Sequence, residues 1–131
     1  MITKIDHIGI ATSDLEGDIG IYRDILGLEV EEIETLQGQK TRIVMIPVGE
    51  SQIELLASSD PNETIARFIA RRGEGVHHIA FGVSDISAML TELEAKGVPL
   101  IDKEPRTGAG GSKIAFLHPS KTKVLIELVE R

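Results

Sequence analysis

An internal repeat constrains the fold of this sequence more than any other feature. His7-Ile8 and Ser13-Asp14 near the start recur as His78-Ile79 and Ser84-Asp85, and both pairs lie 71 residues further along the chain. A chain that carries the same pattern twice in register is expected to build the same structural module twice.

The ends of the two copies also match. An Ile-Glu-Leu triplet centred on Glu54 recurs around Glu127, 73 residues later, and a difference in loop length accounts for the two-residue drift. We therefore predict two modules, at residues 1–59 and 75–131, joined by a linker helix at about 62–72.

Each module has the pattern of a βαβββ unit. In the first, apolar residues alternate over positions 5–11 as in a strand, and Leu15, Ile19, Tyr22 and Leu26 follow at helical spacing. Ser13-x-x-Glu16 is a capping-box pattern, and Gly27 is placed to end the helix. Strands are predicted at 28–34, 41–48 and 52–57, with turns at Gln37-Gly38-Gln39 and 49–51.

The second module repeats this order. We predict a strand at 76–83, a helix at 85–96 ended by Gly97, and strands at 98–102, 113–117 and 123–129. The predicted fold class is α+β, with two tandem βαβββ modules forming a concave mixed sheet.

Strand alternation brings four potential metal ligands to one face of that sheet. Glu54 and Glu127 each lie between apolar neighbours that pack on the other face, and small residues share the face of His78. With no cysteine in the chain, any metal must be bound by nitrogen and oxygen. The predicted ligands of a divalent ion such as Co, Mn, Ni or Zn are His7, Glu54, His78 and Glu127.

Other polar residues are given structural interpretations. His77 points to the opposite face from His78 by alternation, and His118 precedes Pro119 in a turn. The glycine-rich stretch 107–113 lacks Walker spacing, so it is either a flexible hairpin loop or a backbone cradle for an anionic ligand.

Length and charge exclude several classes of protein. The 131 residues suit a single domain spanning 1–131, and a formal net charge of −7 argues against a nucleic-acid partner. No apolar run is long enough to cross a bilayer, so we expect a cytoplasmic protein with no membrane partner. Because a small half-open sheet commonly buries more surface through a twofold contact, we also expect a homodimer.

The chain resembles the vicinal oxygen chelate (glyoxalase/bleomycin resistance/dioxygenase) superfamily over its whole length and, within it, the methylmalonyl-CoA epimerases. Three blocks carry the resemblance to the epimerases: Asp6-His7-Ile8-Gly9-Ile10-Ala11, residues 73–81, and the glycine stretch 108–111 that leads through Phe116-Leu117-His118-Pro119 to residues 124–128.

The resemblance implies an isomerase that interconverts (2R)- and (2S)-methylmalonyl-CoA, a coenzyme A thioester, through a metal-stabilised enolate. It places the metal ligands on the same four residues, with Gln52 as a nearby competitor for the role of Glu54, and makes Glu127 the candidate catalytic group. The catalytic Glu described on the third strand of such epimerases is absent here, where residues 41–43 are Thr-Arg-Ile.

Two alternatives remain open at this point. A glyoxalase I type lactoylglutathione lyase would use the same ligand set on a glutathione substrate. A non-catalytic, resistance-type protein would close around a small molecule without a metal. An extradiol dioxygenase is less favoured, because its two-His, one-carboxylate iron site leaves the fourth ligand without a role.

Overall fold

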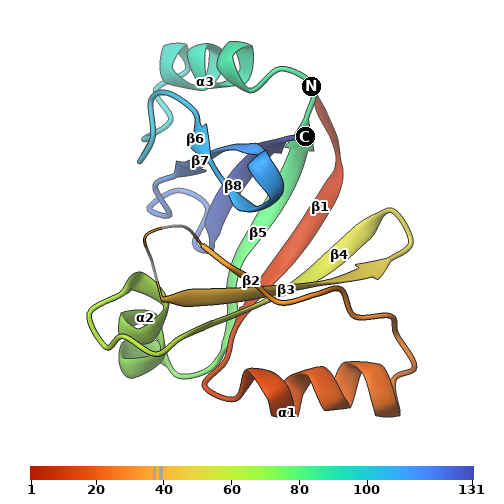
Figure 1. Cartoon of the computed structure of the whole chain (residues 1–131). Helices are drawn as coiled ribbons and strands as arrows, with labels where there is room; N and C mark the ends of the chain where they lie inside the picture. The colour runs from red at the N-terminus through yellow and green to blue at the C-terminus, as the bar shows by residue number, and fades with distance from the viewer. Residues whose placement is uncertain (37, 39) are drawn as a thin grey trace. The chain divides into compact units, whose positions relative to one another are not determined.

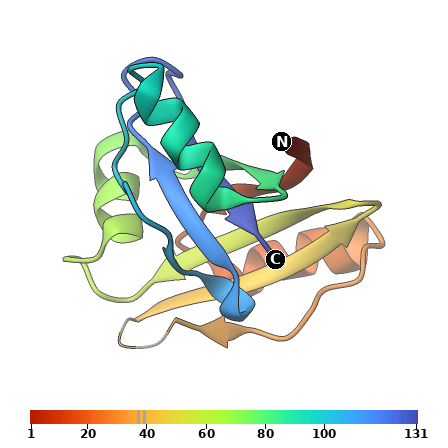
Figure 2. The ribbon, with the colours of Figure 1, turned by 90° about the horizontal axis from the view of Figure 1, so that it is seen from above.

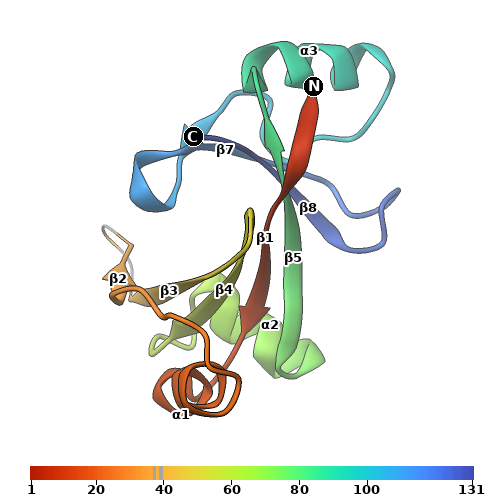
Figure 3. The same cartoon turned by 90° about the vertical axis from the view of Figure 1, so that its right-hand side faces the viewer.

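The computed structural model describes residues 1–36, 38 and 40–131, and these form two compact units. Unit 1 contains residues 1–7 and 78–131, and unit 2 contains residues 8–77. The division falls within β1 (Ile2–Ala11) and β5 (Gly75–Val83), so each of these two strands contributes to both units (Figure 3).

The predicted α+β class is confirmed, and the strands of the described residues form one mixed sheet. Their hydrogen-bonded order is β2-β3-β4-β1-β5-β8-β7-β6. Strand β5 pairs with β8 in parallel, whereas β3 with β4 and β7 with β8 are antiparallel. The remaining strands are β2 (Glu34–Thr35), β3 (Thr41–Val48), β4 (Ser51–Ser58), β6 (Arg106–Thr107), β7 (Lys113–Leu117) and β8 (Leu125–Glu130).

In unit 2, helix α1 (Leu15–Gly20) covers one face of β3 and β4 (Figure 2). Its buried Leu15 and Ile19 pack with Val44, Ile46 and Leu55 in a continuous apolar cluster. The predicted strands at 41–48 and 52–57 and a helix at the predicted place, α2 (Thr64–Arg72), are confirmed with small shifts of their ends.

The start of the first helix differs from the predicted capping box. Asp14 is the N-cap, and its carboxylate accepts a hydrogen bond from the backbone N–H of Gly17 at 3.1 Å. Ser13 instead donates from its backbone N–H and its hydroxyl to Glu74, each at 2.7 Å. The Ser13 hydroxyl, which the local pattern predicts as the helix cap, therefore binds a carboxylate 61 positions away in sequence.

The end of that helix also departs from the predicted spacing. Residues Ile21–Ile25 form a π-helical segment, in which the N–H of Leu26 bonds the carbonyl of Ile21. This wider turn shifts the phase of the helix, so Leu26 is exposed rather than buried. The predicted stop at Gly27 is confirmed, because this residue has the positive φ of 73° that favours glycine.

Two predicted strands are wrong. Of the predicted strand at 28–34, only the last residue belongs to β2, and the N–H of Glu31 bonds Met45 outside any ladder. The predicted strand at 98–102 contributes one isolated bridge, Leu100 to Leu117. Apolar alternation in these segments reflects packing beside the sheet and not pairing within it. The predicted turn at Gln37-Gly38-Gln39 lies partly outside the described residues.

In unit 1, helix α3 (Ile86–Ala95) lies against β7 and β8 (Figure 1). Its buried Ile86 and Leu90 pack with Ala115 and Leu128 of these strands. The predicted limits of this helix are confirmed, since Asp85 is its N-cap and Gly97 follows its last turn with a φ of 75°. Within the described part of the chain, no helix is long and apolar enough to span a membrane.

Candidate metal centre

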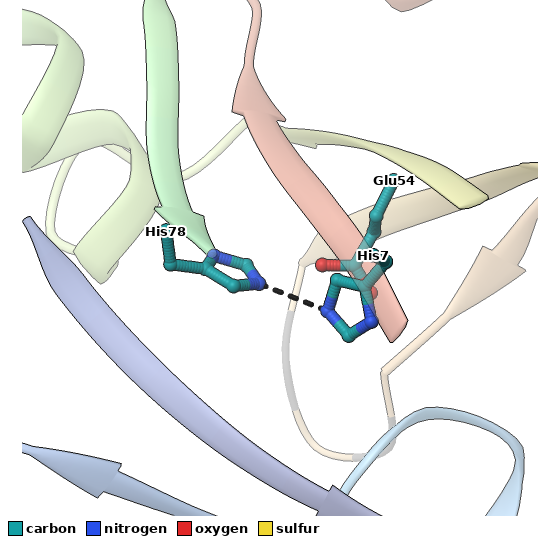
Figure 4. A group of neighbouring side chains, drawn as sticks. All are labelled: His7, Glu54 and His78. Atoms are coloured by element: carbon teal, nitrogen blue, oxygen red, sulfur yellow. Dashed lines mark hydrogen bonds between the residues drawn. The ribbon is translucent and has the colours of Figure 1, made fainter. Parts of the chain in front are cut away.

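Two histidines and a carboxylate from three strands of unit 1 converge on one buried point. The Nε2 atoms of His7 and His78 are 3.1 Å apart (Figure 4). Glu127 places one carboxylate oxygen 3.4 Å from His7 Nε2 and the other 3.5 Å from His78 Nε2. Exposed fractions are 2% for each histidine and 5% for Glu127, so this polar cluster is almost completely shielded from water.

The strand register explains why His78 and Glu127 meet. In the parallel pairing of β5 with β8, Glu127 lies opposite Ala80, which shares the face of His78 two residues earlier. The small side chain of Ala80 leaves room above the sheet for both functional groups. The sequence prediction that a small residue accompanies His78 on its face is consistent with this register.

The spacing of these atoms suits a shared cation. Two ligand atoms that are each about 2.1 Å from one ion are separated by roughly 3.0 to 3.4 Å in octahedral or tetrahedral geometry. The two Nε2 atoms are 3.1 Å apart, and each lies 3.4 or 3.5 Å from a different oxygen of Glu127, so these separations lie in or next to this range. Nitrogen and carboxylate oxygen are also the donor types that divalent first-row ions accept.

A second layer of polar groups orients His7. Its Nδ1 lies 2.8 Å from Asp6 Oδ2, and Asp6 accepts two further hydrogen bonds from Arg131, at 3.0 Å from Nε and 2.9 Å from Nη2. Burial raises the pKa of Asp6, but the hydrogen bonds and charges of Arg131 and His7 outweigh this and hold its pKa below the usual value.

Sequence reasoning missed both Asp6 and Arg131. Strict alternation puts Asp6 on the opposite face from His7, whereas in the structure its carboxylate reaches the neighbouring ring. A local signal does exist for Arg131, because it follows Glu127 by four residues and an even spacing along a strand keeps two residues on one face.

The environment of His78 is aromatic. The rings of Phe116 and His78 are nearly perpendicular, in a T-shaped arrangement, with centroids 6.0 Å apart and an interplanar angle of 87°. The guanidinium of Arg106 lies 5.2 Å from the Phe116 ring centroid, and Asp102 accepts a hydrogen bond from the Phe116 N–H. These contacts hold Phe116 beside the histidine.

Glu54, the fourth predicted ligand, lies in unit 2. It is on β4 opposite Met45 of β3, and it is buried. A buried carboxylate on a strand is uncommon unless it has a charged or hydrogen-bonding partner. Its competitor Gln52 is half-buried and lies opposite Pro47.

The residues predicted to be structural fit that interpretation. His77 packs in unit 2 against Phe68 of α2, with ring centroids 4.8 Å apart. His118 is exposed, and its Nδ1 accepts a hydrogen bond from the N–H of Ser120 in the turn. Residues 41–43 are Thr-Arg-Ile and so carry no carboxylate, and the guanidinium of Arg42 donates to Glu16.

The glycine-rich stretch folds into a tight loop. The N–H of Gly108 bonds the carbonyl of Ser112, and the Ser112 hydroxyl donates to the carbonyl of Ala109. Any side chain at Gly108 would collide with Ile114, since a Cβ there would lie 2.6 Å from its Cγ2. These internal bonds favour the hairpin interpretation.

Comparison with known proteins places the chain in a superfamily. Residues 6–116 match the model of the Glyoxalase/Bleomycin resistance protein/Dioxygenase superfamily, and the chain belongs to it. An ethylmalonyl-CoA/methylmalonyl-CoA epimerase of Cereibacter sphaeroides is 34% identical over 121 residues, which cover 91% of this chain and 90% of that protein.

Solved structures give the same result. A methylmalonyl-CoA epimerase in complex with methylmalonyl-CoA and NH4+ is 40% identical, with a TM-score of 0.93 over 99% of this chain and 95% of the other. A variant of the Streptomyces coelicolor epimerase in complex with 2-nitronate-propionyl-CoA gives the same identity, TM-score and coverage. Within the superfamily the chain therefore belongs with the methylmalonyl-CoA epimerases, and the predicted isomerase class is confirmed.

Proposed function

We propose that this protein is a metal-dependent epimerase that interconverts (2R)- and (2S)-methylmalonyl-CoA. The observation that carries the proposal is the 40% identity, over nearly the whole chain, to an epimerase in complex with methylmalonyl-CoA. The buried cluster of His7, His78 and Glu127 supplies groups suited to that chemistry.

The metal would be held by His7, Glu54, His78 and Glu127. Glu54 is included because it is the repeat counterpart of Glu127 and is a buried carboxylate. When bound, a divalent ion such as Co, Mn, Ni or Zn would act as a Lewis acid that lowers the cost of negative charge on the substrate oxygens.

Glu127 is the proposed proton-transfer group. The substrate hydrogen is on the carbon between the thioester and the carboxylate, and its removal breaks a C–H bond while an O–H bond forms on the base. The carboxylate of Glu127 is buried beside the two histidines, where water competes little for the proton. Return of a proton to the opposite face requires another residue or a water molecule, since residues 41–43 supply no carboxylate.

The test is proton NMR of methylmalonyl-CoA in deuterated buffer, with protein and Co²⁺ and again with EDTA. We expect loss of the α-proton signal with metal, no loss with EDTA and no loss with His78→Ala. His118→Ala, which changes an exposed turn histidine, is the matched control and should exchange like the wild type.

Absence of exchange with metal bound to the wild-type protein would contradict the proposal. The next assay would then be formation of lactoylglutathione from the hemithioacetal of methylglyoxal and glutathione. Binding of methylmalonyl-CoA without bound metal and without exchange would instead favour a non-catalytic binding protein.

A further inference from the structure

A continuous chain of hydrogen bonds connects the solvent-facing end of β8 to the proposed ligand His7. Arg131 directly follows β8 and its side chain is 40% exposed, whereas Asp6 is 2% exposed. Arg131 donates from Nε to Oδ1 of Asp6 and from Nη2 to Oδ2. The Oδ2 atom also lies within hydrogen-bond distance of His7 Nδ1. The guanidinium therefore fixes the carboxylate in two directions.

The orientation of Asp6 decides which nitrogen of His7 is available for a ligand. A neutral imidazole has one N–H donor and one lone-pair acceptor. With Asp6 as the acceptor, the proton is held on Nδ1 and the lone pair of Nε2 faces His78 and Glu127. A carboxylate that was free to rotate would not impose this arrangement.

The chemistry of arginine suits this role. Its planar guanidinium can bind both oxygens of a carboxylate at once, which a lysine ammonium cannot do with the same fixed geometry. Strand β8 supplies Glu127 and Arg131 directly follows it, so one stretch of chain carries a proposed ligand and the residue that orients another. A Cβ at Gly110 of the glycine-rich loop would lie 4.0 Å from Arg131 Nη1, so the guanidinium also lies beside that loop.

We propose that Arg131 is a positioning residue of the metal centre, which acts through Asp6 to fix the tautomer and the ring orientation of His7. The inference rests on the proposed metal-ligand role of His7 but on no particular substrate. It concerns a residue that bonds Asp6 and is not itself a proposed metal ligand.

The first test compares the metal affinity of three variants by calorimetric titration with Co²⁺. Replacement of outer-layer partners of metal ligands commonly weakens binding by about 10- to 100-fold. We expect Arg131→Gln to weaken Co²⁺ binding about tenfold, and Arg131→Lys to weaken it by a smaller factor because the charge is retained.

Arg23→Gln is the matched control. Arg23 bonds Asp24 through Nε at 3.0 Å, the distance at which Arg131 Nε bonds Asp6, but both members of that pair are exposed. Its Co²⁺ affinity should equal that of the wild type. Equal affinities of Arg131→Gln and the wild type would overturn the inference.

The second test needs no metal. Long-range proton–nitrogen NMR of ¹⁵N-histidine protein distinguishes the two tautomers of His7. We expect the Nδ1–H form in the wild type and in Arg23→Gln, and a mixture of forms in Arg131→Gln. An unchanged His7 pattern in Arg131→Gln would contradict the inference, and Arg131→Lys serves as the readout if the glutamine variant does not fold.

These measurements separate the inference from the proposed function. If the wild type fails to exchange the α-proton but its Co²⁺ affinity and His7 tautomer depend on Arg131, the epimerase proposal fails and the inference stands. If exchange is normal and neither property depends on Arg131, the inference alone fails.

Discussion

The two copies of the repeat hold their histidines in different ways. His7 follows Asp6, whose carboxylate binds the ring and is itself bound by Arg131. At the corresponding position before His78 stands His77, which packs against Phe68, while Phe116 contacts the ring of His78. The duplication thus preserved the pair of proposed ligands and not the groups that support them.

The difference shows that the side chains around each histidine depend on the elements that pack next to it in its own copy. A hydrogen bond to a buried carboxylate that an arginine holds in place fixes both the rotation of a ring and its tautomer. An aromatic edge contact restricts rotation but exchanges no proton with the ring. Loss of Asp6 should therefore act on the tautomer of His7, whereas loss of Phe116 should act on the packing around His78.

The largest contrast is expected between the two repeated carboxylates. Glu127→Gln should lower the rate of α-proton exchange by about 10² to 10⁴, because a general base is lost. Glu54→Gln should retain more activity, since its proposed role is that of a ligand. Exchange kinetics at saturating Co²⁺ provide the measurement, and full turnover by metal-loaded Glu127→Gln would rule out its catalytic role.

The next contrast is between the supports of the two histidines. Asp6→Ala should weaken Co²⁺ binding by about 10- to 100-fold, because His7 loses the acceptor that fixes its tautomer. Phe116→Ala should act mainly on stability, with a loss of about 1 to 3 kcal/mol in the free energy of unfolding, because Phe116 is half-buried. Titration calorimetry and urea unfolding measure the two effects, and the reverse pattern would show that the aromatic contact is the stronger determinant.

The helix starts offer a comparison in which the copies agree. Asp14 and Asp85 each accept a hydrogen bond at 3.1 Å from the backbone N–H three residues later. Replacement of either by alanine should cost about 1 kcal/mol of stability, measured by urea unfolding. A much smaller loss for Asp14→Ala would indicate that the Ser13 capping box replaces it.

The smallest effect concerns Glu74, which binds Ser13 before α1, whereas at the start of α3 the carboxylate of Glu130 binds the N–H of Ile86. Hydrogen bonds from the backbone N–H and the hydroxyl of Ser13, and from Thr12, lower the pKa of Glu74 below its usual value of 4.5. Because the folded-state pKa is the lower one, its stabilising contribution is complete above pH 4.5 and is lost as the pH falls through the folded-state pKa.

Thermal unfolding of the wild type and Glu74→Gln between pH 6 and pH 3 tests this. The wild type should be slightly more stable at pH 6, and the two curves should converge toward pH 3. A constant difference across this range would mean that the charge of Glu74 contributes nothing.

Much of the architecture was predictable because it depends on local pattern. The strands at 41–48 and 113–117 and the stops at Gly27 and Gly97 follow from alternation and from the positive φ that glycine accepts. The predicted strands at 28–34 and 98–102 were wrong, because alternation reports a buried face and does not report whether a neighbouring strand offers hydrogen bonds.

The sequence by itself determined the duplication, the α+β class and the convergence of His78 with Glu127, since all three follow from repeat spacing and strand parity. Only the tertiary structure decided that Asp6 and Arg131, 125 positions apart, form an ion pair behind His7. It also decided that the Ser13 hydroxyl donates to Glu74 instead of capping the helix. Such contacts join residues that are distant along the chain, and no local periodicity encodes which distant partner will reach a buried polar group.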